Sequence, residues 1–263
     1  MTYDLAGNAA LVTASSSGLG KASAAVLARE GANVVMNGRD ADRLEAAVDE
    51  VGTDAPGTVV GHVGDLTDPD DIAALAARPV EEFGGLDHLV TSAGGPPSGR
   101  FLDMDDEDWY DAFDLLVMSV VRLVRETADA LSADGGGTLV TITSLSVKEA
   151  IDSLVLSNSV RMGVIGLEKT LSTELAPEIR ANSVLPATHE TPRVEELVQQ
   201  GVDRGDFDSY EEGLEAWSQG VPLERIGRPT ELGEVVAFLC SERSSYLNGV
   251  AVPVDGGASA SNL

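Results

Sequence analysis

A turn rich in serine and glycine follows the first apolar run of the chain. The run Ala9–Val12 is typical of a buried strand, the turn Thr13–Gly20 ends on two glycines, and a helical pattern runs from Lys21 to Glu30. In this order, a strand, a glycine turn and a helix point free backbone N–H groups and a partial positive charge at a phosphate. The pattern predicts a nucleotide phosphate site, although such a loop is also ordinary turn chemistry.

A second stretch bears on which nucleotide binds. Asn37-Gly38-Arg39 follows the next apolar run, and no acidic side chain stands at Asn37 to accept hydrogen bonds from a ribose 2′-OH. The planar guanidinium of Arg39 suits a 2′-phosphate, so NADP(H) is favoured over NAD. Asp40 is explained as the N-cap of the following helix, and the alternative for Arg39 is a surface residue without a cofactor role.

A third group of polar side chains lies later in the chain. Ser157 and Arg161 are four residues apart in a helical pattern, so both face one side of that helix, and Ser144 follows a predicted strand. An arginine stays protonated, so Arg161 can neutralise charge and donate hydrogen bonds but cannot shuttle protons. Ser144 and Ser157 can serve as neutral donors to the same oxygen.

Composition limits the class of protein. The 263 residues include 17 basic and 44 acidic ones, a formal charge of −27, and the acidic residues are spread along the chain. Such a coat indicates a halophilic source and argues against nucleic acid or an anionic membrane as partner. The single Cys240, the absence of a long apolar run and the N-terminal residues lead us to expect a cytoplasmic protein without a membrane span. Three scattered histidines predict no metal site.

Apolar runs alternate with amphipathic ones along the whole chain. The predicted strands are Ala9–Val12, Asn33–Met36, Thr58–Val63, Leu86–Val90, Thr138–Thr143, Ala181–Leu185 and Val250–Val254. The intervening helices include one from Asp105 to Leu131 and one from Leu154 to Leu175, and Ala187–Arg228 is expected to be irregular. This alternation predicts an α/β fold, a doubly wound, mainly parallel seven-stranded sheet of Rossmann type with helices on both faces. We expect one domain, 1–263, with the strand-end turns at one crevice.

The order of these motifs resembles the short-chain dehydrogenase/reductase family, in its 3-oxoacyl-ACP-reductase-like branch. The motifs are Thr13–Gly20, with Ala14 in place of the family's first glycine, Asp65-Leu66, Thr91-Ser92-Ala93-Gly94, Pro186-Ala187 with Thr191, and Val254-Asp255-Gly256-Gly257. Together with Asn37 and Arg39 from the strand end above, the resemblance implies these cofactor contacts: Thr13, Ser15, Ser16, Ser17, Gly18, Leu19, Asp65, Leu66, Ala93, Gly94, Arg161, Pro186 and Thr191.

The family's catalytic residues are matched only in part. Ser144 fits the family's serine, but Ser157 stands in place of the tyrosine, Arg161 in place of the lysine and Leu116 in place of the asparagine. A serine hydroxyl is a far weaker acid than a phenol, and a leucine cannot anchor the water of the family's proton relay. His189 and Lys148 are alternative catalytic groups; a loop histidine and a surface amine are the plainer explanations.

Three functions follow from these residues. The first is an NADP(H)-dependent oxidoreductase with catalytic residues Ser144, Ser157 and Arg161, acting on a small neutral polyol, sugar or ketone below a lid formed by 187–228. The second is a dinucleotide-binding protein of the same fold that lacks hydride transfer and acts as a sensor or partner subunit. The third is a lyase or dehalogenase-type enzyme, which Gly18 and Gly20 make less fitting. The resemblance also implies a homo-oligomer, a tetramer or a dimer.

Overall fold

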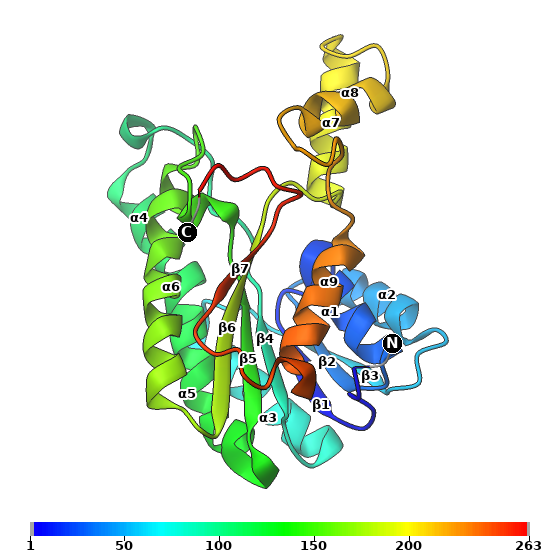
Figure 1. The fold of residues 1–263 in the computed structure, drawn as a ribbon, viewed down its shortest axis with the longest axis vertical. Helices are drawn as coiled ribbons and strands as arrows, with labels where there is room; N and C mark the ends of the chain where they lie inside the picture. Colours follow the sequence, from blue (N-terminus) through cyan, green and yellow to red (C-terminus); the bar gives the residue numbers. More distant parts are fainter. Residues whose placement is uncertain (1–2, 262–263) are drawn as a thin grey trace.

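All strands of the structure run parallel in one sheet, in the order β3-β2-β1-β4-β5-β6-β7 (Figure 1). The computed structural model describes residues 3–261 and, among them, all side chains except those of Asp134, Arg193, Glu196, Leu197, Gln200 and Arg204. The strands are β1 (Ala9–Val12), β2 (Asn33–Gly38), β3 (Val59–Val63), β4 (His88–Thr91), β5 (Gly137–Ile142), β6 (Ile179–Pro186) and β7 (Ala251–Val254). The predicted doubly wound fold is confirmed.

Helices cover both faces of the sheet because successive strand residues point to opposite faces. On one face, Val12 and Met36 pack with α1 (Gly18–Arg29), α2 (Ala41–Gly52) and α9 (Pro229–Cys240). On the other, Leu11 and Val35 pack with α3 (Pro69–Phe83), α5 (Ser119–Ser132) and α6 (Val155–Glu174). Parallel strands buried on both faces are largely apolar, which explains the nearly continuous apolar runs in the sequence.

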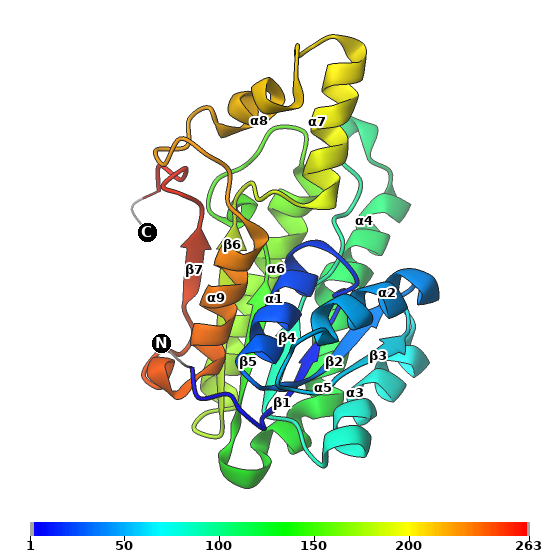
Figure 2. The same cartoon turned by 90° about the vertical axis from the view of Figure 1, so that its right-hand side faces the viewer.

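The segment Ala187–Arg228, expected to be irregular, instead contains two helices, α7 (Pro192–Arg204) and α8 (Tyr210–Ser218). Pro192 occupies the first turn of α7, and the Ser209 hydroxyl accepts a hydrogen bond from the Glu212 N–H at the start of α8. The ring of Phe207 lies against glycines of both helices. Figures 1 and 2 show the pair standing beyond the sheet, above the carboxyl ends of the strands.

The predicted long helix Asp105–Leu131 is interrupted. It consists of α4 (Asp106–Phe113), a π-helical turn at Asp114–Met118, and α5. π turns are rare and are found most often at functional sites, where they displace the side chains of one turn. Within the described residues no helix is long and apolar enough to cross a bilayer.

Gly20 is the tightest point of the glycine turn. A Cβ at this position would lie 2.5 Å from the backbone oxygen of Ala14, whose own φ is +44°. Neither backbone can yield without moving the start of α1, so we expect Gly20→Ala to lower the free energy of unfolding by about 2 kcal/mol. Guanidinium unfolding of both variants tests this, with Gly85→Ala as control because a Cβ there meets nothing within 4 Å. Equal unfolding midpoints would contradict the expectation.

His88 makes the stability of the fold depend on pH. Its ring lies buried at the start of β4, with Nε2 2.9 Å from the Asn8 amide and Nδ1 2.9 Å from the Thr138 hydroxyl. Burial lowers the pKa of His88 to about 4, from 6.5. Below pH 6.5 the histidine therefore binds a proton in the unfolded chain but not in the folded one. The free energy of unfolding falls as a result until the pH reaches about 4.

We expect the wild type to lose about 2 kcal/mol more stability than His88→Gln between pH 7 and pH 5, because about 1.5 pH units of that range lie below the unfolded pKa. Denaturant unfolding at constant salt measures the two losses. If both proteins lose the same free energy, the folded histidine titrates near its usual pKa and the expectation is wrong.

Candidate active site

A cleft of about 1000 Å³ opens along the carboxyl ends of the strands. Most of the predicted cofactor residues line it: Ser16, Ser17, Gly18, Leu19, Asn37, Arg39, Asp65, Leu66, Ala93, Gly94, Arg161 and Thr191. They come from the ends of the four strands β1 to β4, from α6 and from the start of α7. The sequence motifs thus converge on one crevice because every parallel strand delivers its following loop to the same edge.

Three predicted cofactor residues hold the turns instead of lining the cleft. The Thr13 hydroxyl donates to the Ser92 carbonyl at 2.7 Å and accepts from the Ser92 N–H at 2.8 Å, which joins the ends of β1 and β4. The buried Ser15 hydroxyl donates to the Val12 carbonyl and accepts from the Asn37 N–H. Pro186 is buried at the end of β6, opposite Val254 of β7.

Asn37 lines the cleft, but its amide is occupied by the protein itself. Its Oδ1 accepts a hydrogen bond from the Ala14 N–H at 3.1 Å, and its Nδ2 donates to the Gly64 carbonyl at 3.0 Å. The side chain therefore ties the glycine turn to the segment after β3. An acidic side chain could accept the first of these bonds but could not donate the second.

The N-terminus of α1 faces the cleft. Ser17 is its N-cap and makes no side-chain hydrogen bond to the first turn, and Gly18 has a positive φ of 57°. The first backbone N–H groups of a helix have no partner within the helix, so they remain available to an anion in the cleft. This arrangement fits the pyrophosphate of a dinucleotide.

Two arginines and two carboxylates, Asp40 and Asp65, line the far end of the cleft. The exposed Arg39 lies with Nη1 3.4 Å from Oδ2 of Asp65, and Arg43, one turn into α2, also lines this end. Burial alone would raise the pKa of the Asp65 carboxyl, but hydrogen bonds from Thr67 and Arg39 lower it below its usual value. The sequence reasoning missed Arg43; its position one helical turn after Asp40 was the available signal.

Arg161 lies at the inner end of the cleft with no carboxylate partner among the described residues. It is only 8% exposed, and its long hydrogen bonds reach two backbone carbonyls, Thr143 at 3.3 Å and Gly94 at 3.4 Å. Its Nε has no hydrogen-bond partner in the described part of the chain. Burial lowers the pKa of Arg161 to about 10, so the guanidinium stays charged at neutral pH. A buried cation in this state attracts a ligand oxygen that carries negative charge.

The serines near Arg161 form a cluster around a residue that the sequence reasoning missed. Ser146 lies between the other two: its N–H donates to the Ser144 Oγ at 3.1 Å, and its Oγ is 3.0 Å from the Oγ of Ser157. The two predicted residues are therefore connected through Ser146 by hydrogen bonds. Because the Ser144 oxygen accepts from the backbone, its O–H is left to donate to another oxygen.

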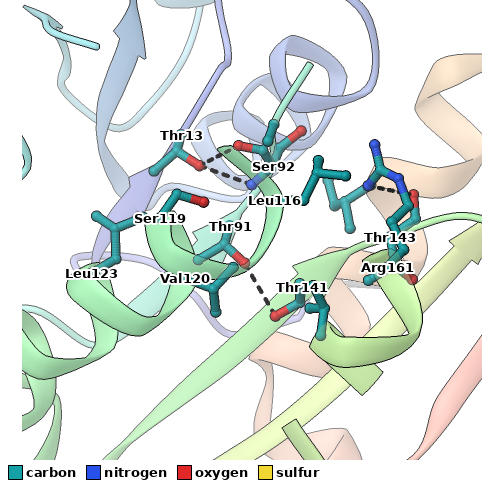
Figure 3. A pocket seen from close by; sticks show the side chains of 13 residues that line it. Thr13, Thr91, Ser92, Leu116, Ser119, Val120, Leu123, Thr141, Thr143 and Arg161 are labelled. Carbon is teal, nitrogen blue, oxygen red and sulfur yellow. Dashed lines mark hydrogen bonds between the residues drawn. The ribbon is translucent and has the colours of Figure 1, made fainter. Parts of the chain in front are cut away.

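Below the inner end of the cleft lies a small polar cavity (Figure 3). It is lined by Thr13, Thr91, Ser92, Ala93, Leu116, Ser119, Val120, Leu123, Thr141, Ile142, Thr143, Arg161 and Val164. Leu116, the residue at the family's asparagine position, belongs to the π turn and lies between Ser92 and Arg161 in this view. The π turn thus brings an apolar side chain to a cavity whose other walls carry both hydroxyl groups and apolar side chains.

The alternative catalytic groups lie elsewhere. The ring of His189 is buried against Gly227, its Nδ1 is 3.0 Å from the Ala187 carbonyl oxygen, and burial lowers its pKa. Lys148 follows a short 3-10 turn and, like Ser144 and Ser157, is not among the residues that line the cleft or the cavity. Among the residues that line these two spaces in the described part of the chain, there is no tyrosine.

Comparison with known proteins agrees with this architecture. The sequence model of the family described as Enoyl-(Acyl carrier protein) reductase matches residues 13–259. The chain is 31% identical to 3-oxoacyl-[acyl-carrier-protein] reductase FabG of Thermotoga maritima over 254 residues, 96% of this chain and 98% of that protein. It is 33% identical to human dehydrogenase/reductase SDR family member 4 over 258 residues, covering 96% and 88% of the two chains.

Among solved structures, L-sorbose reductase from Gluconobacter frateurii, in complex with NADPH and L-sorbose, superimposes with a TM-score of 0.94 at 30% sequence identity. The superposition covers 99% of this chain and 100% of that one. With the sheet order, the glycine turn and the cleft described above, these matches establish that the chain belongs to the short-chain dehydrogenase/reductase family.

Proposed function

We propose that the protein is an NADP(H)-dependent oxidoreductase that interconverts a carbonyl and an alcohol on a small molecule. The observation that carries the proposal is Arg161, a buried guanidinium without a carboxylate at the inner end of the cleft. Such a cation stabilises the negative charge that develops on a carbonyl oxygen when its carbon gains a hydride.

The residues of the cleft fit the phosphorylated cofactor in particular. The backbone N–H groups at the start of α1 suit a pyrophosphate, and Arg39 with Arg43 suits a 2′-phosphate next to Asp65. NADPH in the similar L-sorbose reductase supports the same choice, with NAD as the weaker candidate. Thr191, at the start of α7, is placed to close over the bound molecule.

The cofactor supplies the hydride, so the chain itself has to orient the substrate and stabilise its oxygen. In the proposed arrangement Arg161 balances the charge, and Ser144 and Ser157 donate neutral hydrogen bonds. Ser146 positions both serines by bonding to each of them. The serine hydroxyls are far weaker acids than a phenol, and the arginine stays protonated, which sets this site apart from one that uses a tyrosine.

We assign the segment 187–228, with α7 and α8, as the lid over the substrate. Its exposed carboxylates include Glu195, Asp203, Glu211 and Glu215. Negative charge at the entrance disfavours phosphorylated or acyl-carrier substrates and fits a small neutral sugar, polyol or ketone. The acidic coat of the whole chain also leads us to propose assays in concentrated KCl.

The second candidate function is a protein that binds the dinucleotide and transfers no hydride. The observation that favours it is the engagement of Ser157 with Ser146 in place of a tyrosine. This candidate predicts tight NADPH binding without NADPH consumption for any carbonyl compound, and binding that Ser144→Ala leaves unchanged.

We expect Arg161→Gln to lower kcat about 100-fold, because it removes the positive charge facing the developing oxyanion. NADPH oxidation over a panel of sugars and ketones in concentrated KCl measures this. Arg125→Gln, an exposed residue of α5, removes the same charge at the surface and serves as control. Wild-type protein that binds NADPH but reduces no compound of the panel would favour the second candidate function.

We expect Arg39→Asp to lower the affinity for NADPH relative to NADH at least about tenfold, since a charge-assisted contact to the 2′-phosphate becomes a repulsion. Fluorescence titration with both cofactors gives the ratio. Arg243→Asp makes the same change of charge at an exposed site away from the cleft. If the ratio is the same in both variants, Arg39 does not select the cofactor.

A further inference from the structure

Glu168 is a buried acid on the helix that carries Arg161. It is only 4% exposed, and it lies seven residues after Arg161 on α6, about two helical turns along the same face. Glutamate rarely lies in a protein interior without a cationic partner, and none of the described cations forms an ion pair with it. The roles proposed for the cleft residues do not involve the Glu168 carboxyl group.

Its polar neighbours are hydroxyl groups from two adjacent strands. Oε2 accepts a hydrogen bond from the Ser183 hydroxyl of β6. Oε1 has no hydrogen-bond partner among the described residues, although the Thr141 hydroxyl of β5 lies close enough to influence the carboxyl group. Thr141 and Ser183 are directly opposite each other in the β5–β6 ladder, so the carboxyl group lies over this pair.

The row of hydroxyls continues toward the cleft. The Thr91 hydroxyl of β4 is hydrogen-bonded to the Thr141 hydroxyl at 3.1 Å, and the two residues are again ladder partners (Figure 3). Hydroxyl hydrogens rotate, so such a row can pass a proton in either direction. Thr91 and Thr141 both line the polar cavity, so the row that begins at Glu168 ends in that cavity.

The cavity in turn meets the cofactor cleft. Five residues line both spaces: Ser92, Ala93, Ile142, Thr143 and Arg161. With about 10 Å³ of free space, the cavity has room for roughly one water molecule, and the partnerless Nε of Arg161 together with the surrounding hydroxyls supplies the polar contacts that such a water needs. Polar side chains therefore extend from Glu168 to the inner end of the cleft, and the hydrogen-bonded pair Thr91–Thr141 lies between the two ends.

We propose that Glu168 is the proton donor for carbonyl reduction, acting through Thr141, Thr91 and the cavity below Arg161. This inference rests on the proposed oxidoreductase function. The carbonyl carbon gains a hydride, with its electron pair, from the reduced nicotinamide, and the carbonyl oxygen gains one proton. The cavity end of the row gives that proton, each hydroxyl that gives a proton receives one from its neighbour, and the net change is that the Glu168 carboxyl becomes a carboxylate. The carboxylate takes up a proton from solvent before the next turnover.

The protonation state of Glu168 supports this role. Burial raises the pKa of the carboxyl group to about 8, and the hydrogen bond from Ser183 and the nearby Thr141 hydroxyl oppose this rise. The groups that face it from β5 and β6 are these hydroxyls, and Arg161 is the charged group on its own helix face. The side chain of Glu168 is therefore a neutral acid at pH 7. Its pKa lies close to the working pH, which suits a general acid.

The test compares kcat as a function of pH in wild type and in Glu168→Gln, which keeps the shape and the contact with Ser183 but has no acidic proton. We expect the wild-type rate of reduction to fall as pH rises through about 8. In Glu168→Gln, kcat should be about 100-fold lower, without that fall and with unchanged affinity for NADPH. Glu174→Gln, an exposed residue at the end of α6, is the matched control.

A second variant separates a proton path from a structural role. Thr141→Val interrupts the row with little change of volume, and we expect it to lower kcat as much as Glu168→Gln does. Infrared spectroscopy should detect the C=O stretch of a protonated carboxyl group at pH 7 in wild type and Thr141→Val, and its loss in Glu168→Gln. This measurement needs no substrate, and in Thr141→Val the retained band also verifies that the protein is folded around the carboxyl group.

The outcomes are distinct. The same kcat and pH profile in wild type and Glu168→Gln would overturn this inference and leave the proposed function intact. An ionised Glu168 at pH 7 in wild type would have the same consequence. Wild-type protein that consumes no NADPH would overturn both. Loss of the high-pH fall in Glu168→Gln, together with a slow Thr141→Val that retains the carboxyl band, would establish the path.

Discussion

The common direction of the strands is the constraint on which every other feature of this molecule depends. Because all ladder pairs are parallel, each strand delivers its following loop to the same edge of the sheet. The glycine turn, the Arg39 loop and the Arg161 environment belong to distant parts of the sequence and still share one cleft. The same geometry aligns Thr91, Thr141 and Ser183 in one row, since ladder partners on neighbouring strands point to the same face.

Within this frame the interior holds two ionisable side chains that have no ion-pair partner of opposite charge in the described part of the chain. Arg161 and Glu168 share one face of α6 but are separated by two turns and by Val164, so neither neutralises the other directly. Leaving polar atoms unsatisfied in the interior is costly, and a folded chain keeps such groups only where other contacts hold them in place. Here the two carbonyls around Arg161 and the hydroxyl of Ser183 provide those contacts. Unpaired groups of this kind mark candidate functional sites more reliably than surface charges do.

The sequence predicted the fold and the outline of the cleft because both follow from local patterns. Alternating apolar runs identified all the strands, and Asp40 indeed caps α2 by accepting a hydrogen bond from the Arg43 N–H. The π turn escaped because its residues continue the helical periodicity, and α7 with α8 escaped because their acidic surfaces hid the Pro192 and Ser209 start signals. Ser146 and Glu168 could not be singled out, since their importance lies in cross-element contacts. A glutamate in an acidic chain looks like surface until its helix face is known.

The substitutions at the family's catalytic positions change what the site must obtain from elsewhere. In the proposed site, Ser144 and Ser157 donate hydrogen bonds, Arg161 supplies charge and Leu116 supplies only bulk, so none of them gives up a proton near neutral pH. A reduction still consumes one proton for each hydride. Of the buried groups whose pKa the structure moves, His88 lies at the amino-terminal end of its strand, away from the cleft, and becomes a weaker base; the ring of His189 is held against Gly227. Glu168 alone, among the described residues that we compared, combines a pKa near neutrality with a hydroxyl row that reaches the cavity beneath Arg161. Each reduction thus needs one proton. In the proposed mechanism an internal acid supplies it, in place of the phenol that is absent from the described lining of the cleft.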